Sequence, residues 1–182
     1  MNFSSPIPPD EQIIDLHSDE YFMGEALRQA AKAYAAEEVP IGAIIVRDGR
    51  IIARAHNQVE TLKDATAHAE ILAISQAQQV VDDWRLTGAT LYVTKEPCPM
   101  CAGAIMLSRI ERVVFGTGDP KAGGAGGALN ILGLAGLNHK CQATGGVKEN
   151  ECTTMLKGFF KEQRQRRDTG EGELSPPTGG LN

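Results

Sequence analysis

Three potential metal ligands and one carboxylate are spaced in a way that could support chemistry. Cys98 and Cys101 are three residues apart, and Pro99 between them suits the first turn of a helix, where its missing N–H costs nothing. Side chains three apart on a helix share a face, so both sulfurs can reach one point. His68 lies upstream, with Glu70 two residues after it. Imidazole nitrogen and thiolate sulfur are ligands that zinc prefers, so we expect one zinc ion per subunit at these three ligands.

Glu70 would give such a metal site a group that can move protons. Structural zinc usually has four evident protein ligands, whereas a catalytic site supplies three and leaves one position for water. No clear fourth ligand accompanies His68, Cys98 and Cys101 in the sequence. Zinc can lower the pKa of bound water to about 7, so a zinc-bound hydroxide is available at neutral pH. We therefore expect Glu70 to be catalytic and to shuttle a proton from that water to the substrate.

Two other interpretations of these residues stay open. The zinc could be structural in a non-catalytic RNA-binding module, where Glu70 would only stabilise the first turn of a helix. Alternatively, Cys98 and Cys101 could form the reversible disulfide of a redox protein. In a redox protein His68 and Glu70 would have no role, which makes this the weakest of the three interpretations.

The surrounding sequence predicts elements that could hold these groups. An apolar pattern with helical spacing follows Ser18, a favourable capping residue, and predicts a helix over residues 18–36. Asp48-Gly49 between two apolar runs predicts a β-hairpin over residues 41–55. The remaining pattern predicts helices beginning near residues 66 and 99, strands over 89–94, 112–115 and 140–144, and a helix over 150–166. This alternation indicates an α/β fold, in which a mixed sheet of about five strands is covered by helices on both faces.

The 182 residues suit a single folded domain with loose ends. Proline and polar residues predict a disordered N-terminal extension over residues 1–17, and glycine, proline and charge predict a disordered tail over 168–182. The folded domain is then expected over residues 18–167. Within it, residues 116–139 are rich in glycine, and their composition predicts a flexible loop with a short helical turn near 128–132.

The charge distribution permits a nucleic-acid partner although the formal net charge is −5. Residues 139–167 contain seven basic side chains and three acidic ones. Screening over about 8–10 Å means that a bound RNA would respond mainly to the nearby charges. The sequence shows no signal-peptide pattern and no apolar run of the roughly 20 residues that a membrane helix needs. We therefore expect no membrane partner and a reducing, cytoplasmic location, where a CxxC pair is more often metal-binding than a disulfide.

Several motifs carry a resemblance to a known family. His-x-Glu followed by Pro-Cys-x-x-Cys is the signature of zinc-dependent nucleobase deaminases, including those that act on cytosine and guanine. Further blocks are Val39-Pro40-Ile41-Gly42-Ala43, Asp119-Pro120-Lys121 with the glycines that follow, Leu137-Asn138-His139, and Phe159-Phe160 followed by basic residues. Over residues 21–164 the sequence resembles bacterial tRNA-specific adenosine deaminases, within the cytidine/deoxycytidylate deaminase superfamily.

The resemblance implies hydrolytic deamination of adenosine to inosine at the wobble position of a tRNA anticodon, with release of ammonia. It also implies a homodimer whose subunits have the three-layer α/β/α fold of cytidine deaminases. Carried over to matching positions, Asn57 would contact the flipped base, Asp119 and Lys121 the anticodon stem-loop, and Phe159 the flanking RNA. A free-base deaminase that acts on guanine or cytosine with the same zinc chemistry remains the alternative.

Overall fold

A five-stranded mixed sheet forms the centre of the computed structural model, which describes residues 15–169. In spatial order the strands are β2 (Arg50–His56), β1 (Gly42–Arg47), β3 (Ala89–Lys95), β4 (Arg112–Thr117) and β5 (Gln142–Gly145). Strand β1 pairs antiparallel with both β2 and β3, whereas β3, β4 and β5 are parallel. The expected mixed sheet is confirmed. Of the extension expected over residues 1–17 and the tail expected over 168–182, residues 1–14 and 170–182 lie outside the described residues, and Asp168 is the last residue of the final helix.

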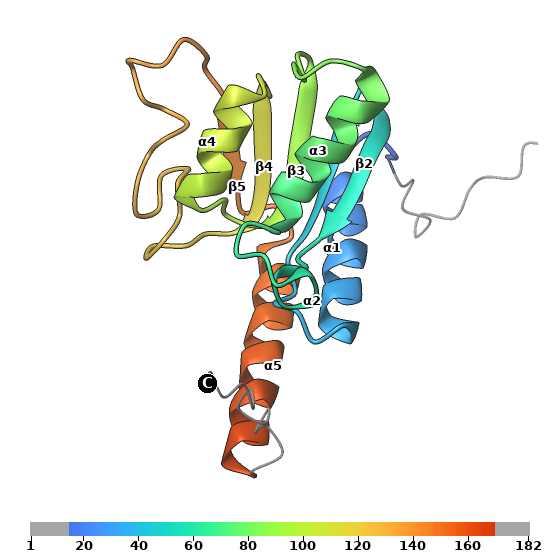
Figure 1. Ribbon diagram of the computed structural model, residues 1–182, viewed down its shortest axis with the longest axis vertical. Helices are drawn as coiled ribbons and strands as arrows, with labels where there is room; N and C mark the ends of the chain where they lie inside the picture. The colour runs from blue at the N-terminus through green and yellow to red at the C-terminus, as the bar shows by residue number, and fades with distance from the viewer. Residues whose placement is uncertain (1–14, 170–182) are drawn as a thin grey trace, which may run out of the picture.

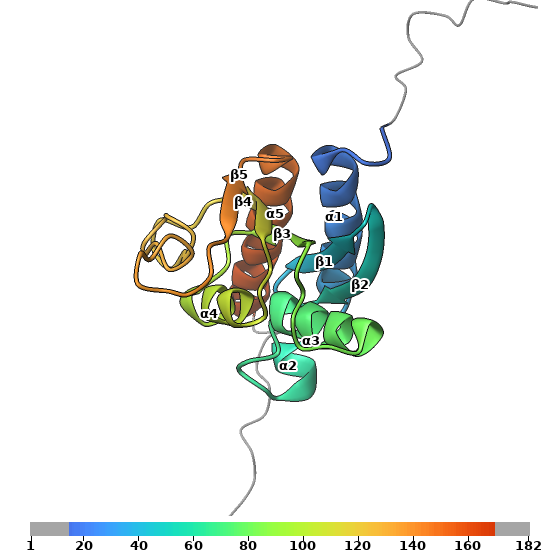
Figure 2. The same cartoon turned by 90° about the horizontal axis from the view of Figure 1, so that it is seen from above.

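Helices cover both faces of the sheet and give three layers (Figures 1 and 2). Helices α1 (Asp19–Ala35) and α5 (Glu149–Asp168) lie on one face, and α3 (Ala69–Val81) and α4 (Pro99–Leu107) lie on the other. A short helix, α2 (Val59–Leu62), follows β2 and was not predicted from the sequence. Helix α5 extends well beyond the end of the sheet (Figure 1). The three-layer α/β/α arrangement is therefore confirmed.

Local sequence signals account for the first elements. The Ser18 hydroxyl caps α1 by accepting a hydrogen bond from the Tyr21 N–H at 3.1 Å. Asp48 and Gly49 have φ values of 52° and 72°, so both lie in the left-handed region that a tight two-residue hairpin requires. The turn therefore joins β1 and β2 as their composition predicts.

Small residues allow the helices to pack closely on the sheet. Ala69, Ala73 and Ala77 lie on one face of α3 and are fully buried against the strands. On the other side, a Cβ at Gly42 would overlap the backbone of α1 at Ala26, so glycine is required for this approach. Close packing fixes the position of each helix start relative to the strand ends. No helix in the described part of the chain is long and apolar enough to cross a membrane.

Candidate active site

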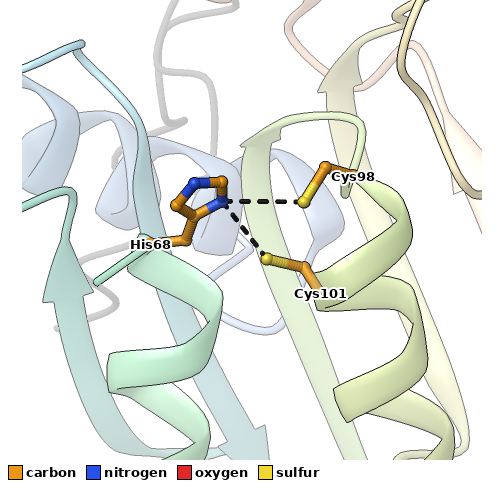
Figure 3. Close-up of side chains that lie close together, drawn as sticks. All are labelled: His68, Cys98 and Cys101. Atoms are coloured by element: carbon orange, nitrogen blue, oxygen red, sulfur yellow. Dashed lines mark hydrogen bonds between the residues drawn. The ribbon is translucent and has the colours of Figure 1, made fainter. Parts of the chain in front are cut away.

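His68, Cys98 and Cys101 converge at the starts of α3 and α4, as Figure 3 shows. The Nδ1 atom of His68 lies 3.6 Å from the Cys98 sulfur and 3.5 Å from the Cys101 sulfur. All three potential ligand atoms lie within 4.8 Å of one another, a spacing that could hold a metal ion. One nitrogen and two sulfurs at this separation fit the donor set that zinc prefers.

Neighbouring helix starts bring these three side chains together. His68 is the N-cap residue of α3 and Cys98 is the N-cap residue of α4, with Pro99 at the first position of that helix. Cys101 lies on the same turn of α4, so its sulfur faces the same point as that of Cys98. Free N–H groups at both helix starts favour anions, which include thiolates.

The electrostatic surroundings favour one thiolate even before a cation binds. The Cys101 thiol and the His68 imidazole stabilise the Cys98 thiolate and lower the pKa of Cys98 to about 3. The contact with Cys98 in turn raises the pKa of the Cys101 thiol and that of the His68 imidazole. A divalent cation would displace the protons that these two groups retain.

Glu70 provides an independent sign that this site is built for a ligand. Its side chain is only 3% exposed, and its Oε2 atom is the one buried side-chain oxygen or nitrogen without a hydrogen-bond partner among the described residues. Leaving such an atom unpaired costs about 1–3 kcal/mol. Burial also raises the pKa of the Glu70 carboxyl, so this group can hold a proton closer to neutral pH than an exposed glutamate does.

Asn57 directly follows β2, beside the segment that carries His68. The neighbouring Gln58 N–H donates to the Ala67 carbonyl at 3.0 Å, which ties this segment to the residue before His68. The Asn57 side chain is almost fully buried, and its Nδ2 donates to Glu38 Oε2 at 3.1 Å. The sequence did not single out Glu38, because a glutamate just after a helix looks like any surface charge.

The glycine-rich segment is held by Glu96, a second buried carboxylate for which the sequence predicted no role. Glu96 Oε2 accepts from the Asp119 N–H at 2.7 Å, and Oε1 accepts from the N–H groups of Ala125 and Gly127 at 3.0 and 2.8 Å. The Gly124 N–H donates to the Pro97 carbonyl at 2.7 Å, directly beside Cys98. The loop is therefore anchored to the ligand-bearing turn by specific hydrogen bonds that its composition did not indicate.

The expected helical turn near residues 128–132 is wrong. The N–H groups of Ala128 and Leu129 both donate to the Gly123 carbonyl, and Ala125 and Asn130 form an isolated antiparallel bridge. The segment folds back on itself because its N–H groups pair with carbonyls and with Glu96 across the loop.

The three residues expected to contact RNA lie in two different places. The Asp119 carboxylate pairs with Lys95 and accepts hydrogen bonds from the N–H groups of Lys121 and Ala122. Two of these hydrogen bonds are made within the loop itself. The Lys121 side chain is exposed on that loop. Phe159 lies in α5, where it is buried and packs edge-to-face on Tyr34 with ring centroids 5.5 Å apart. Their contacts with RNA stay predictions.

Comparison with known proteins places these features in a family. A family model described as MafB19-like deaminase matches residues 17–164. A tRNA-specific adenosine deaminase of Bacillus subtilis (strain 168) is 52% identical over 157 residues, which cover 86% of this chain and 98% of that protein. A structure from a study of A-to-I editing by tRNA:A34 deaminases at the wobble position superimposes with a TM-score of 0.72 and 43% identity, covering 75% of this chain and 99% of that one. Guanine deaminase from Nitrosomonas europaea gives a TM-score of 0.70 at 26% identity, covering 87% of this chain and 97% of that one.

Proposed function

Because this chain belongs to the family of tRNA-specific adenosine deaminases, we propose that it converts adenosine to inosine in tRNA by hydrolysis and releases ammonia. The observation that carries this proposal is the placement of the unpartnered Glu70 Oε2 beside the converging His68, Cys98 and Cys101. A purely structural metal site has no use for a buried carboxylate oxygen without a partner. The edited position that we propose is the wobble position of the anticodon.

We propose zinc as the ion that His68, Cys98 and Cys101 hold, one per subunit. Zinc would supply Lewis acidity, which makes water a nucleophile near neutral pH. Glu70 would take a proton from the attacking water and deliver it to the purine ring nitrogen. It would then take the proton of the new C6 hydroxyl and pass it to the amine, so that the C6–N bond breaks, the oxygen stays on C6 as the carbonyl and ammonia leaves.

The contacts that select the substrate are proposed on the same basis. Asn57 would bind the base that is flipped into the site, since its amide is buried beside the segment that carries His68. Asp119 and Lys121 would contact the anticodon stem-loop from the anchored glycine-rich segment. Phe159 and the basic end of α5 would meet the flanking RNA, with Arg166 and Arg167 in the last turn of that helix.

We propose that the protein acts in the cytoplasm as a homodimer. Exposed apolar side chains on α4 support an association surface, since Leu107 is 74% exposed and Met100 is 37% exposed. Sedimentation equilibrium of the wild-type chain would test this proposal. A single species with the mass of one 19.5 kDa chain at micromolar concentration would contradict the dimer.

The decisive experiment follows inosine formation in an RNA anticodon stem-loop that carries adenosine at the wobble position. Zinc-loaded wild-type protein and Glu70→Ala are compared, with free adenosine, adenine, guanine and cytosine as parallel substrates. We expect inosine only in the RNA and only with the wild type. Turnover of free guanine without RNA editing would instead support a guanine deaminase, the activity of a neighbour at 26% identity.

A further inference from the structure

Glu38 is a buried carboxylate that the reaction described above does not use. It lies between α1 and β1, and its side chain is 1% exposed. Oε2 accepts from Asn57 Nδ2 at 3.1 Å and from the Glu60 N–H at 3.2 Å, and Oε1 accepts from the Thr61 N–H at 2.6 Å. Among the described residues, no lysine or arginine forms an ion pair with it.

The charge state of Glu38 determines what it can offer to these donors. Burial opposes its ionisation, but hydrogen bonds from Thr61, Glu60 and Asn57 outweigh burial and place the pKa of the Glu38 carboxyl below its usual value. At neutral pH it is therefore an ionised carboxylate, which accepts hydrogen bonds and cannot donate one.

This chemistry allows only one orientation of the Asn57 amide. A carboxamide has two N–H donors on nitrogen and one acceptor oxygen, so only Nδ2 can face a carboxylate. The oxygen must point elsewhere, and within residues 15–169 no hydrogen bond reaches Asn57 Oδ1. One Nδ2 hydrogen and Oδ1 therefore remain for a ligand.

We propose that Glu38 is a positioning residue that sets which end of the Asn57 amide faces the substrate base. This proposal rests on the proposed function, because it deepens the role of Asn57 as the base contact. The site then offers one donor and one acceptor side by side. That pair complements a base edge that carries an acceptor next to an amine, as adenine does with N7 and its 6-amino group.

A purely structural role for Glu38 must be distinguished from this one. The N–H groups of Glu60 and Thr61 belong to the first turn of α2, whose N-cap residue Gln58 makes no side-chain capping bond. Glu38 therefore also satisfies donors that would otherwise be unpaired. If Glu38 served only as that cap, its loss would lower the melting temperature by the same amount whichever residue occupies position 57.

The test is a double-mutant cycle on the zinc-loaded full chain. Glu38→Gln, Asn57→Ala and the double variant are compared for kcat and KM on the anticodon stem-loop, together with zinc content and melting temperature. Glutamine keeps the size of the side chain but has one acceptor oxygen in place of two. Its N–H₂ group must therefore face either the Asn57 amide, which then turns over, or the Thr61 N–H, which then loses its partner and lowers the melting temperature. We expect Glu38→Gln to lower kcat/KM roughly 10- to 100-fold in the wild-type background. With alanine at position 57 the same change should cost less than about 3-fold. Zinc content should stay at one ion per chain.

Equal losses in both backgrounds would overturn the proposal and leave Glu38 as a cap of α2. Glu60→Gln is the matched control, because the exposed Glu60 carboxylate pairs only with Lys63, at 3.6 Å, and that variant should keep wild-type kcat/KM. Full activity of Asn57→Ala would show that Asn57 does not contact the base, which also overturns the proposal. If the wild-type protein edits no RNA, the proposed function itself is wrong. This result can be told apart from a failure of the positioning role of Glu38, in which the wild type is active.

A second pair of variants keeps the test valid if Glu38→Gln folds poorly. Asn57→Asp places two carboxylates against each other, so we expect a lower melting temperature. Adding Glu38→Gln to Asn57→Asp restores a donor and an acceptor with reversed polarity. The melting temperature should recover in part, because the Glu60 N–H that Oε2 accepts in the wild type loses its partner. A double variant that is no more stable than Asn57→Asp would show that the two side chains do not act as a pair.

Discussion

The backbone N–H of Asp119 donates to the Glu96 carboxylate at 2.7 Å, which joins the glycine-rich loop to the strand end that leads into Cys98. The same carboxylate accepts two more N–H groups from the loop, those of Ala125 and Gly127. The segment expected to meet RNA and the turn that carries two of the proposed metal ligands are therefore both held by the Glu96 carboxylate.

Glu96→Gln should loosen this loop without removing the proposed metal ligands. The glutamine nitrogen would face at least one backbone N–H, and an unpaired buried N–H costs about 1–3 kcal/mol. We expect KM for the RNA stem-loop to rise while zinc content stays at the wild-type level. Faster hydrogen exchange of the amides from 123 to 129 would show the loosening directly. Glu111→Gln, in which the more exposed carboxylate accepts from the Gly88 N–H at 3.0 Å, is the control. Unchanged exchange in the loop would contradict the anchoring role of Glu96.

A methyl group at position 123 should disturb the same contact between the loop and the Glu96 carboxylate, this time by a change in the loop. A Cβ at Gly123 would overlap the Glu96 carboxylate, whereas a Cβ at Gly136 meets nothing within 4 Å. We expect Gly123→Ala to destabilise the protein by about 1–3 kcal/mol, as overpacking usually does. Gly136→Ala should be close to neutral. Chemical denaturation of both variants measures the difference, and equal stabilities would refute the close contact.

Variants of the candidate active-site residues should distinguish the proposed zinc ligands from Glu70, the proposed proton-transfer residue. Cys98→Ala and His68→Ala each remove one of the three proposed zinc ligands, so we expect loss of both bound zinc and activity. Glu70→Ala should retain zinc and lower kcat by roughly 100- to 10,000-fold, the usual contribution of a general acid–base group. Metal analysis of the purified variants decides the point. Full zinc occupancy in Cys98→Ala, or wild-type turnover by Glu70→Ala, would show that the roles are misassigned.

Stability should fall in acid because of an ion pair between α1 and β4. Two Arg112 nitrogens donate to the Asp19 carboxylate at 2.8 and 2.7 Å, and the Tyr92 hydroxyl donates to it at 2.9 Å. The hydrogen bond from Arg112 holds the pKa of Asp19 below its ordinary value of 3.8. Because the pKa of Asp19 is lowered in the folded state, the contribution of this ion pair to the free energy of unfolding is complete above pH 3.8. It is lost as the pH falls through the folded-state pKa of Asp19.

Asp19→Asn should therefore lower the free energy of unfolding by about 1–3 kcal/mol at pH 7. The difference in free energy of unfolding between the wild type and this variant should narrow as the pH falls below about 4 toward the lowered folded-state pKa of Asp19, at which the wild-type carboxyl also becomes neutral. Urea denaturation between pH 3 and 7 follows both proteins. A difference in free energy of unfolding that does not change with pH would show that the ionised form of Asp19 does not stabilise the protein.

The sequence by itself determined the elements and residues whose signals are local. Ser18 caps α1, Asp48-Gly49 turns the hairpin, and three-residue spacing places Cys98 and Cys101 on one face of α4. Backbone geometry and helix periodicity depend on near neighbours, so these features can be read without knowing the fold. The His-x-Glu and Cys-x-x-Cys spacing predicted the group that the structure assembles.

Only the tertiary structure decided how the rest of the site is held. Glu38 and Glu96 bind partners 19 or more residues away, and most of those partners are backbone N–H groups that every residue except proline has. Such pairing leaves no mark in the spacing of residue types, so both glutamates resemble surface charges in the sequence. For the same reason the glycine-rich segment was expected to be flexible, and its hydrogen bonds to a buried carboxylate became visible only when the strands and helices were in place.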